Sequence, residues 1–575
     1  MENKRYQSLA LIFAGTCWGA VLLRTMFGID LEDEAYWVAT YVQLWQGGVP
    51  LMSIWDGHTG FFLMMPFFAL YHAVVPSLDG IVLFSRIVSV LLFTGMALAL
   101  AWVVHRGMQC QGKQVPVSWL ILAMMPVVCW SNNILHINYN TGAAWMLTLL
   151  CAWYHFDFRD TRGFFLIAGI LAGMACIFYP TMLILVVLLG AAAALRNWRH
   201  SDMRGDMRAW PYYFLGNLLV GGLFLLWIFT QGSLQEFTVA MQHVLHGPHE
   251  AYRGPLNAHF FYQTYIASIG HFFVRKSYLA LLLLYLAGLY YCTRRMTAEN
   301  SRIWLPRLFV AYVCLSAWIN RNGYGYAILS FLLAYFLWMY VIGERPWRKN
   351  WIFYIVGCLF IGMYSLTSDN KNVLLGLSAS TVIFAAGVSI SLFHYWQEHS
   401  GRWKQVLMIL LMSAFAGLAH LYLFVYGDVS IPKCLQGGHM TQGVYQGIYT
   451  SQQRQEYLMG MEQIVAEEVQ PGDRVSVITL EPSIYLMSEG QIFAPWTFDA
   501  QYLFKGFYSD KPMTDYYRAY HALPDVIFAT NRMEKSRDIL SNNAFTIHDL
   551  LDTHYVLVRK AVIAGKEIYV WKKVG

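Results

Sequence analysis

Long apolar segments separated by short polar ones make up roughly the first three quarters of the chain. Apolar runs of about 20 residues, long enough to cross a bilayer as a helix, recur throughout this part. The thirteen runs start near Leu9, Gly80, Val117, Gly142, Phe164, Thr181, Tyr212, Ser277, Leu308, Tyr324, Trp351, Val373 and Gln405. This pattern predicts a polytopic α-helical membrane protein with about thirteen transmembrane helices.

The pattern changes after Gly427, where polar residues become frequent. A helix is expected over Glu456 to Glu468, and short runs rich in β-branched residues predict strands. The predicted strands cover Arg474 to Thr479, Pro524 to Ala529, Tyr555 to Arg559 and Glu567 to Lys572. We therefore expect a transmembrane domain over residues 1–427 and a soluble mixed α/β domain over residues 428–575.

The segment from Ile29 to Asp79, between the first two apolar runs, has a pattern of its own. It predicts an amphipathic helix from Glu34 to Trp45, a glycine-rich turn, and an apolar piece from Phe61 to Val75. That second piece contains Pro66 and is short for a transmembrane span. We expect interfacial helices in this loop, which lie along the membrane surface and do not cross it.

Composition supports the membrane assignment. Hydrophobic residues make up 57% of the chain, charged residues 13%, and the mean hydropathy is +0.41, whereas soluble domains carry about 25% charged residues. The net charge of +6 does not indicate nucleic-acid binding, because the positive residues lie in short loops between apolar runs. No cleavable signal peptide is expected, since the run from Ser8 to Gly28 is long enough to span and lacks a small-residue cleavage site.

Lysine and arginine are distributed unevenly between alternate loops. If the N-terminus is cytoplasmic, each cytoplasmic segment carries at least two of them, and the outer loops carry only Arg253, Arg275, Lys276, Arg321 and Lys371. The loop from Ile29 to Asp79 has none. Cytoplasmic loops are normally enriched in positive charge. The asymmetry therefore predicts a cytoplasmic N-terminus and an outer C-terminal domain.

Four acids, Asp30, Glu32, Asp33 and Glu34, follow the first apolar run at once. Carboxylates beside a bilayer are costly unless they are solvated, paired or used. A solvated acidic loop and a functional site are both open interpretations.

Five histidines mark the outer loop from Gln231 to Lys276, namely His243, His246, His249, His259 and His271. A metal site is one interpretation. We favour a loop at the level of the lipid headgroups, because the spacings match no known ligand motif.

Several motifs occur in a fixed order between Asp33 and Pro180, within a similarity of pattern that covers about the first 340 residues. They are Asp33-Glu34-Ala-Tyr36, Gly48-Val-Pro50, Asp56-Gly-His58, Arg86-Ile-Val-Ser89 and Ala172-Gly-Met-Ala-Cys-Ile-Phe-Tyr-Pro180. This set resembles the GT-C superfamily of membrane glycosyltransferases. The most similar members are the bacterial 4-amino-arabinose transferases that modify lipid A and the protein O-mannosyltransferases. A thirteen-helix body with an outer C-terminal domain is also the plan of that superfamily.

The chain departs from the superfamily pattern at three places. Asn140 stands where an acid is usual before the fourth helix, Tyr179 stands where a lysine precedes the proline, and Thr59-Gly60 follows His58 in place of Pro-Pro. An amide can hydrogen-bond a hydroxyl or a phosphate, but it cannot act as a base.

The resemblance implies an inverting transfer of a sugar from a polyprenyl phosphate, in bacteria undecaprenyl phosphate, to a glycan, lipid or protein acceptor. It would act at the outer face of the bacterial inner membrane, with the C-terminal domain in the periplasm. Asp33 is the implied general base, and Glu34 orients the acceptor or a metal. The expected phosphate and substrate contacts are His58, Asn140, Arg253 and Arg321. Asp56 and His58 are candidates for a divalent metal ion, although a loop hydrogen bond is the commoner role for such a histidine.

Two other function classes remain open. A transporter or flippase of lipid-linked sugars would place charges or broken helices near the bilayer midplane, whereas most charges here lie at helix ends. A non-catalytic membrane scaffold would have little use for the carboxylate cluster.

Overall fold

The structure of the protein is a computed structural model. It describes residues 2–47, 63–110, 130, 134–156, 161–199, 210–231, 258–274, 276–319, 324–345, 350–367, 373–398, 403–423, 425–478, 481–494, 497, 516–518, 520–530 and 547–574. The chain forms two compact units. The first contains Met1–Arg24, Ser89–Leu223 and Leu256–Phe424, and the second contains Thr25–Val88, Phe224–Pro255 and Val425–Gly575.

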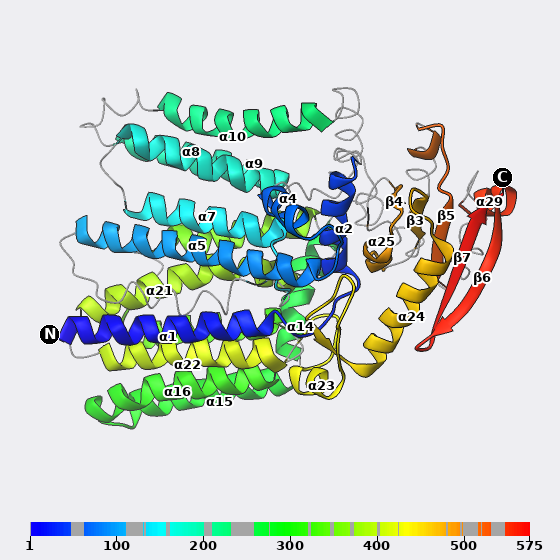
Figure 1. Cartoon of the computed structure of the whole chain (residues 1–575). Helices are drawn as coiled ribbons and strands as arrows, with labels where there is room; N and C mark the ends of the chain where they lie inside the picture. Colours follow the sequence, from blue (N-terminus) through cyan, green and yellow to red (C-terminus); the bar gives the residue numbers. More distant parts are fainter. Residues whose placement is uncertain are drawn as a thin grey trace. The chain divides into compact units, whose positions relative to one another are not determined.

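The helices of the apolar part run as the hydrophobic pattern predicts (Figure 1). They are α1 (Glu2–Arg24), α5 (Ile81–Cys110), α7 (Tyr139–Phe156), α8 (Thr161–Phe178), α9 (Leu183–Arg199), α10 (Trp210–Gln231), α13 (Ala258–Phe261), α14 (Ser268–Val274), α15 (Lys276–Arg294), α16 (Ala298–Ile319), α17 (Tyr324–Val341), α19 (Trp351–Thr367), α20 (Val373–Ala379), α21 (Thr381–Glu398) and α22 (Trp403–Leu423). A short 3-10 turn, η4 (Pro180–Met182), precedes α9, and a π-helical segment, η7 (Tyr262–Ala267), precedes α14. Twelve of the thirteen predicted runs coincide with helices. The run beginning near Val117 lies outside the described residues.

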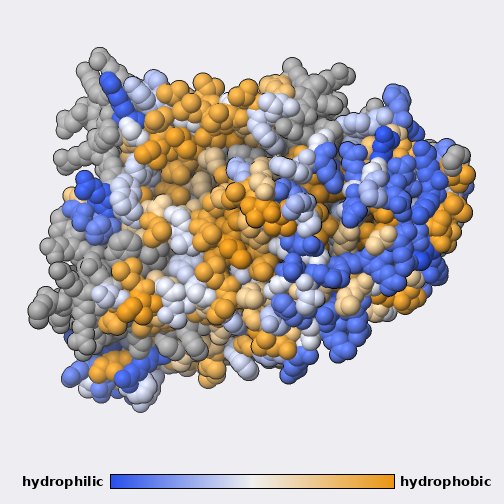
Figure 2. Space-filling view, in the orientation of Figure 1, coloured by the Kyte–Doolittle hydropathy of each residue, from blue (hydrophilic) through white to orange (hydrophobic). Residues whose placement is uncertain are grey.

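Three helices in the described part of the chain are long and apolar enough to cross a membrane: Ile81–Cys110, Pro211–Thr230 and Ala298–Ile319. Eight shorter apolar helices accompany them. Large apolar side chains are exposed on several of these helices, for example Leu218 and Leu284. Figure 2 shows broad hydrophobic areas on the visible surface. Such surfaces suit a lipid environment, so this is a membrane protein, and thirteen spans remains a prediction.

Helix α1, which precedes the acidic loop, pairs with α22, the last helix before the C-terminal domain, inside the first unit. The Tyr422 hydroxyl of α22 donates to the Ala20 carbonyl oxygen of α1 at 2.6 Å. The Arg24 Nε donates to the Leu421 carbonyl oxygen at 2.9 Å. These bonds satisfy backbone carbonyls at helix ends, where intrahelical partners are missing.

The second unit contains a five-stranded sheet in the order β4-β3-β5-β7-β6. Its strands are β3 (Arg474–Ile478), β4 (Gln491–Ile492), β5 (Val526–Thr530), β6 (Tyr555–Ile563) and β7 (Lys566–Lys573). β3 is parallel to β4 and β5, and β7 is antiparallel to β5 and β6. The helices α23 (Ile431–Gln436), α24 (Gln452–Glu468), α25 (Ser483–Met487) and α29 (Ile547–His554) accompany the sheet, and β1 (Gly438–His439) pairs with β2 (Tyr449–Thr450). The four predicted strands and the predicted helix are confirmed.

The loop between α1 and α5 belongs to this second unit and contains helices α2 (Asp33–Trp45) and α4 (Met65–Val74). α2 lies where the sequence predicts a helix, but every residue from Glu34 to Leu44 is buried. The Gln43 side-chain amide donates to the Ala494 carbonyl oxygen at 2.7 Å. Gln46 accepts from the Ile492 amide at 2.9 Å and donates to the Gly490 carbonyl oxygen at 3.2 Å. The predicted helix is confirmed, and its two glutamines bind the C-terminal domain.

Candidate functional site

Asp30 lies just before α2, the helix that carries Asp33 and Glu34, and binds backbone amides at its start. Its Oδ1 accepts from the Glu32 amide at 3.1 Å, and its Oδ2 accepts from the Glu34 amide at 2.9 Å. The first amides of a helix have no intrahelical acceptor, and a short acidic side chain just before the helix satisfies them. Asp30 is only 4% exposed. The interpretation of this stretch as a solvated acidic loop is therefore wrong.

Glu34 forms a buried ion pair with Arg86 of α5. The Arg86 Nε and Nη2 atoms donate to the two carboxylate oxygens, each at 2.6 Å. The remaining guanidinium donors reach the backbone carbonyl oxygens of Thr25 and Gly28 at 2.7 Å. The Glu34 side chain is 1% exposed and that of Arg86 is 5% exposed. Such a two-pronged pair fixes geometry, so Arg86 ties the chain leaving α1 to the start of α2.

Asp33, the neighbour of Glu34, accepts a hydrogen bond from a tyrosine hydroxyl. It is half-buried, and the Tyr426 hydroxyl donates to its Oδ2 at 2.8 Å. Asp33 and Glu34 are adjacent on a helix, where successive side chains point about 100° apart. One acid therefore faces Arg86 while its neighbour faces a different group.

The pKa values of two of these carboxyls are raised. Burial is the main cause for Asp30, and the charge of Asp33 adds to it, although the amides of Glu34 and Glu32 oppose the shift. The result is a pKa of about 8 for Asp30. Burial also raises the pKa of Asp33, and the Tyr426 hydrogen bond lowers it. A carboxyl with a raised pKa is a stronger proton acceptor once it is ionised.

We expect the stability of the protein to fall as pH rises between about 4 and about 8. The folded Asp30 keeps a proton that the unfolded chain releases in this range, so raising the pH favours unfolding. Asp30→Asn should make the stability less dependent on pH. Thermal unfolding midpoints of the detergent-solubilised protein, measured across this pH range, test this expectation. Equal slopes for the wild type and the variant would show that Asp30 is not the source.

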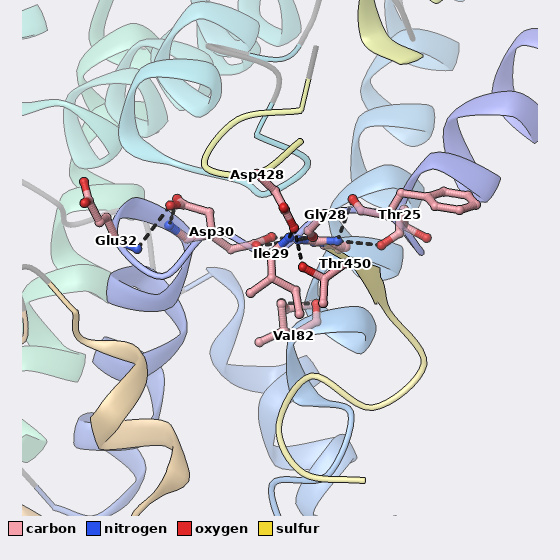
Figure 3. A network of polar contacts seen from close by, with 12 residues as sticks. Thr25, Gly28, Ile29, Asp30, Glu32, Val82, Asp428 and Thr450 are labelled. Atoms are coloured by element: carbon pink, nitrogen blue, oxygen red, sulfur yellow. Dashed lines mark hydrogen bonds and ion pairs between the residues drawn. The ribbon is translucent and has the colours of Figure 1, made fainter. Parts of the chain in front are cut away.

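The segment that follows α22 binds the turn formed by residues 29–34, which we call the acidic turn. The Asp428 Oδ2 accepts from the Ile29 amide at 3.0 Å and from the Thr450 hydroxyl. Figure 3 shows the Asp428 carboxylate reaching toward Ile29 and Thr450. The backbone of Gly28 also pairs with that of Tyr449, with a distance of 2.7 Å from the amide nitrogen to the carbonyl oxygen. Two segments about 400 positions apart in sequence are thus held together.

Gly427 has a φ of +72°, and a Cβ atom there would lie 2.7 Å from the Asp30 Oδ1 and 3.0 Å from its Cα. A side chain would be strained by the backbone angle and would also push against the acidic turn. We expect Gly427→Ala to destabilise the protein by about 1–3 kcal/mol and to reduce activity. Thermal unfolding and turnover measure both effects.

Gly472→Ala is the matched control, because Gly472 has a φ of +94° and no heavy atom within 4 Å of the added Cβ. It carries the backbone strain without the contact. If both variants retain equal activity, the close approach to Asp30 has no functional role.

Tyr445 contributes a hydroxyl to the same region. Its side chain is fully buried, and its oxygen has no hydrogen-bond partner among the described residues. Burial raises its pKa well above the usual range, and the charges of Glu34 and Asp30 add to this effect. Tyr445 therefore remains protonated.

Of the residues that the sequence selected, the structure brings Asp33 and Glu34 together. Asn140 lies in the other unit, at the first turn of α7, where it is 7% exposed and its Oδ1 has no hydrogen-bond partner in the described part of the chain. Asp56, His58, Arg253 and Arg321 lie outside the described residues. So do His243, His246 and His249.

No group of three or more His, Cys, Asp or Glu side chains able to hold a metal ion occurs among the described residues. The acidic turn does not fit a metal, because both oxygens of Glu34 bind Arg86 and both oxygens of Asp30 accept backbone amides. A divalent metal at Asp56 and His58 stays a prediction.

Sequence reasoning missed Tyr426, Asp428 and Tyr445 as parts of this site. It noted Arg86 only within a motif. A signal was present for Arg86, because an arginine within an apolar membrane helix is costly and needs a partner. No such signal marks Tyr426, since a tyrosine near a membrane boundary is common.

Comparison with known proteins gives structural matches only. No protein-family model matches the chain, and no curated protein sequence is similar to it. The crystal structure of ArnT from Cupriavidus metallidurans bound to undecaprenyl phosphate matches over 98% of both chains, with 12% identity and a TM-score of 0.44. The apo structure of the same protein matches over 98% of both chains, with 10% identity and a TM-score of 0.38.

Proposed function

We propose that this protein is an inverting glycosyltransferase that moves a sugar from a polyprenyl phosphate to an acceptor hydroxyl or phosphate, with Asp33 as the general base. One observation carries the proposal. Asp33 is a half-buried carboxylate with a raised pKa, placed in the turn that follows the first apolar helix, with one oxygen held by Tyr426. A carboxylate in this state suits proton transfer at the membrane surface.

The reaction needs a base, a leaving group and a single displacement. Ionised Asp33 takes the proton of the acceptor hydroxyl, and the hydroxyl oxygen forms a bond to the anomeric carbon of the sugar. The bond from that carbon to the carrier phosphate oxygen breaks, and the phosphate leaves with the electron pair. Attack from the face opposite the phosphate inverts the anomeric carbon.

The other acids of the turn have supporting roles in this proposal. The oxygens of Glu34 are both taken by Arg86, so we now assign Glu34 to positioning of the turn. The oxygens of Asp30 hold the start of α2. This leaves Asp33 as the acid whose Oδ1 is suited to meet the acceptor.

The remaining roles follow from the resemblance. We propose that Arg253 and Arg321 contact the carrier phosphate, since cations at the outer face are scarce and charge-assisted hydrogen bonds to phosphate are strong. Asn140 is suited to a sugar hydroxyl or a phosphate, because its buried Oδ1 lacks a partner among the described residues and lies in the first turn of α7. His58 is the further phosphate contact, and with Asp56 it would hold a divalent metal if one binds.

The carrier that we name is undecaprenyl phosphate, which is also the ligand of the first ArnT structure described above. We place the protein in a bacterial inner membrane with its N-terminus in the cytoplasm and its C-terminal domain in the periplasm. The distribution of Lys and Arg among the loops supports this orientation. The acceptor would be a glycan, a lipid or a protein.

The proposal is tested by incubating the purified protein with a panel of polyprenyl-phosphate sugars and a lipid and glycan extract of the cell envelope. We expect one donor to be consumed, with the sugar appearing on an acceptor by mass spectrometry. Donor binding without turnover would overturn the proposal in favour of a transporter, and absence of binding would favour a scaffold.

A further inference from the structure

The Tyr426-Gly427-Asp428 segment engages the acidic turn with three consecutive residues. Tyr426 donates its hydroxyl to Asp33, the Gly427 backbone packs against Asp30, and Asp428 accepts from the Ile29 amide. We call this segment the exit clamp. Its three contacts reach three different residues of the turn between Ile29 and Asp33, so the clamp fixes the turn in position and in orientation.

The exit clamp is itself held from the C-terminal domain. The Arg454 guanidinium of α24 donates to the Gly427 carbonyl oxygen. The Thr450 hydroxyl donates to Asp428, and the other Asp428 oxygen accepts from the Val429 amide at 2.8 Å. A hydrogen bond to an ionised group is stronger than one between neutral groups. The clamp is therefore a fixed element of this unit, with Tyr426 aimed at Asp33.

We propose that the exit clamp positions the catalytic carboxylate, and that the Tyr426 hydroxyl, by occupying Oδ2 of Asp33, directs Oδ1 toward the acceptor. This inference rests on the proposed function and deepens it. Tyr426 acts through Asp33 and does not touch the reactants, so it is a positioning residue.

The groups around Asp33 determine whether loss of the Tyr426 hydroxyl raises or lowers the pKa of Asp33. Asp30, Glu32 and Glu34 are the other acids of this turn; Asp30, with a pKa of about 8, is mostly protonated at neutral pH, and Arg86 is bound to Glu34. Tyr445 stays a neutral hydroxyl, and Arg454 binds the Gly427 carbonyl. The hydrogen bond from Tyr426 favours the charged form of Asp33 and opposes the effect of burial. Removing this hydroxyl should therefore raise the pKa of Asp33.

The test is the pH dependence of kcat for sugar transfer. Tyr426→Phe should move the acidic limb of the profile up by about one pH unit, as expected for loss of one hydrogen bond to a carboxylate. At a pH on that limb, kcat should fall about tenfold. The KM for the donor should change little, because Tyr426 does not contact the donor.

Tyr422→Phe is the matched control. This variant also removes one tyrosine hydroxyl, from the last turn of α22, but the partner of that hydroxyl is the Ala20 carbonyl oxygen at 2.6 Å. A loss of packing or of folded protein would lower activity without moving the limb. We expect the Tyr422→Phe limb to coincide with that of the wild type. A limb that shifts equally in both variants would overturn the proposal.

A second variant keeps the proposal testable if Tyr426→Phe folds poorly. Placing 3-fluorotyrosine at position 426 retains the ring and makes the hydroxyl a stronger donor. The acidic limb should then move to lower pH, opposite to the shift in Tyr426→Phe. An unshifted limb in a well-folded variant would overturn the role of Tyr426.

Failure of this inference differs from failure of the proposed function. If Asp33→Asn retains full transfer, the proposed function itself is wrong. If Asp33→Asn is inactive and Tyr426→Phe leaves the limb in place, only the role of the exit clamp is wrong.

Discussion

Asp33→Asn is expected to lower kcat for sugar transfer by about 10²–10⁴-fold if Asp33 is the general base that we propose, with little change in the KM for the donor. Asparagine has almost the same shape as aspartate and can still accept the Tyr426 hydroxyl hydrogen bond that the wild type makes at 2.8 Å. It cannot take a proton. The measurement is single-turnover transfer at saturating donor, with folding checked by thermal unfolding.

Two further variants distinguish the loss of a base at position 33 from a general loss of negative charge in the turn. Asp33→Glu keeps the base but moves it by one methylene, so it should retain a part of the activity that Asp33→Asn loses. Glu32→Gln removes an exposed acid from the same turn and should stay within about threefold of the wild type, as is usual for surface positions. An equal loss in Glu32→Gln and Asp33→Asn would mean that the net charge of the turn matters and a base at Asp33 does not.

Arg86→Met removes the cation that holds the exit of α1 and the start of α2 together, and we expect it to cost about 3–5 kcal/mol of stability. The large effect arises because Glu34 would then be a buried carboxylate without its partner, and because the carbonyl oxygens of Thr25 and Gly28 would lose their donor. Thermal unfolding in detergent measures the loss, and transfer activity should fall with it.

A double variant shows how much of the stability lost in Arg86→Met comes from the unpaired charge of Glu34 and how much from lost packing. Glu34→Leu combined with Arg86→Met leaves no uncompensated charge, so it should recover a large part of the stability lost in Arg86→Met alone. Arg86→Lys should not rescue, since a lysine cannot reach both carboxylate oxygens and two carbonyls at once. If Arg86→Met unfolds at the wild-type temperature, the ion pair has no structural role.

The C-terminal domain forms one compact unit with the loop that carries Asp33. The sequence separates residues 428–575 from the rest, but the compact unit that contains this domain also takes in Thr25–Val88. α2 is bound by Ala494, Gly490 and Ile492 through its two glutamines. The domain therefore holds the helix that carries Asp33.

The sequence alone determined the helices, the strands and the place of the acids. Apolar runs predict helices because a membrane-buried backbone must satisfy its own hydrogen bonds, and the strands of the C-terminal domain follow from short runs rich in β-branched residues. The order of the motifs led to the GT-C resemblance. None of these signals requires knowledge of contacts between distant residues.

Only the tertiary structure decided which partner each acid has. The resemblance selects Asp33 as the base, but the charge and position of Asp33 and Glu34 in the sequence do not show which of them is bound by a cation. Glu34 meets Arg86 from 52 positions away, and Asp33 meets Tyr426 from 393 positions away. Adjacent residues on a helix face different neighbours, and those neighbours are fixed by packing of segments that are remote in sequence. That packing ties Glu34 into an ion pair and leaves Asp33 as the carboxylate that we propose as the base.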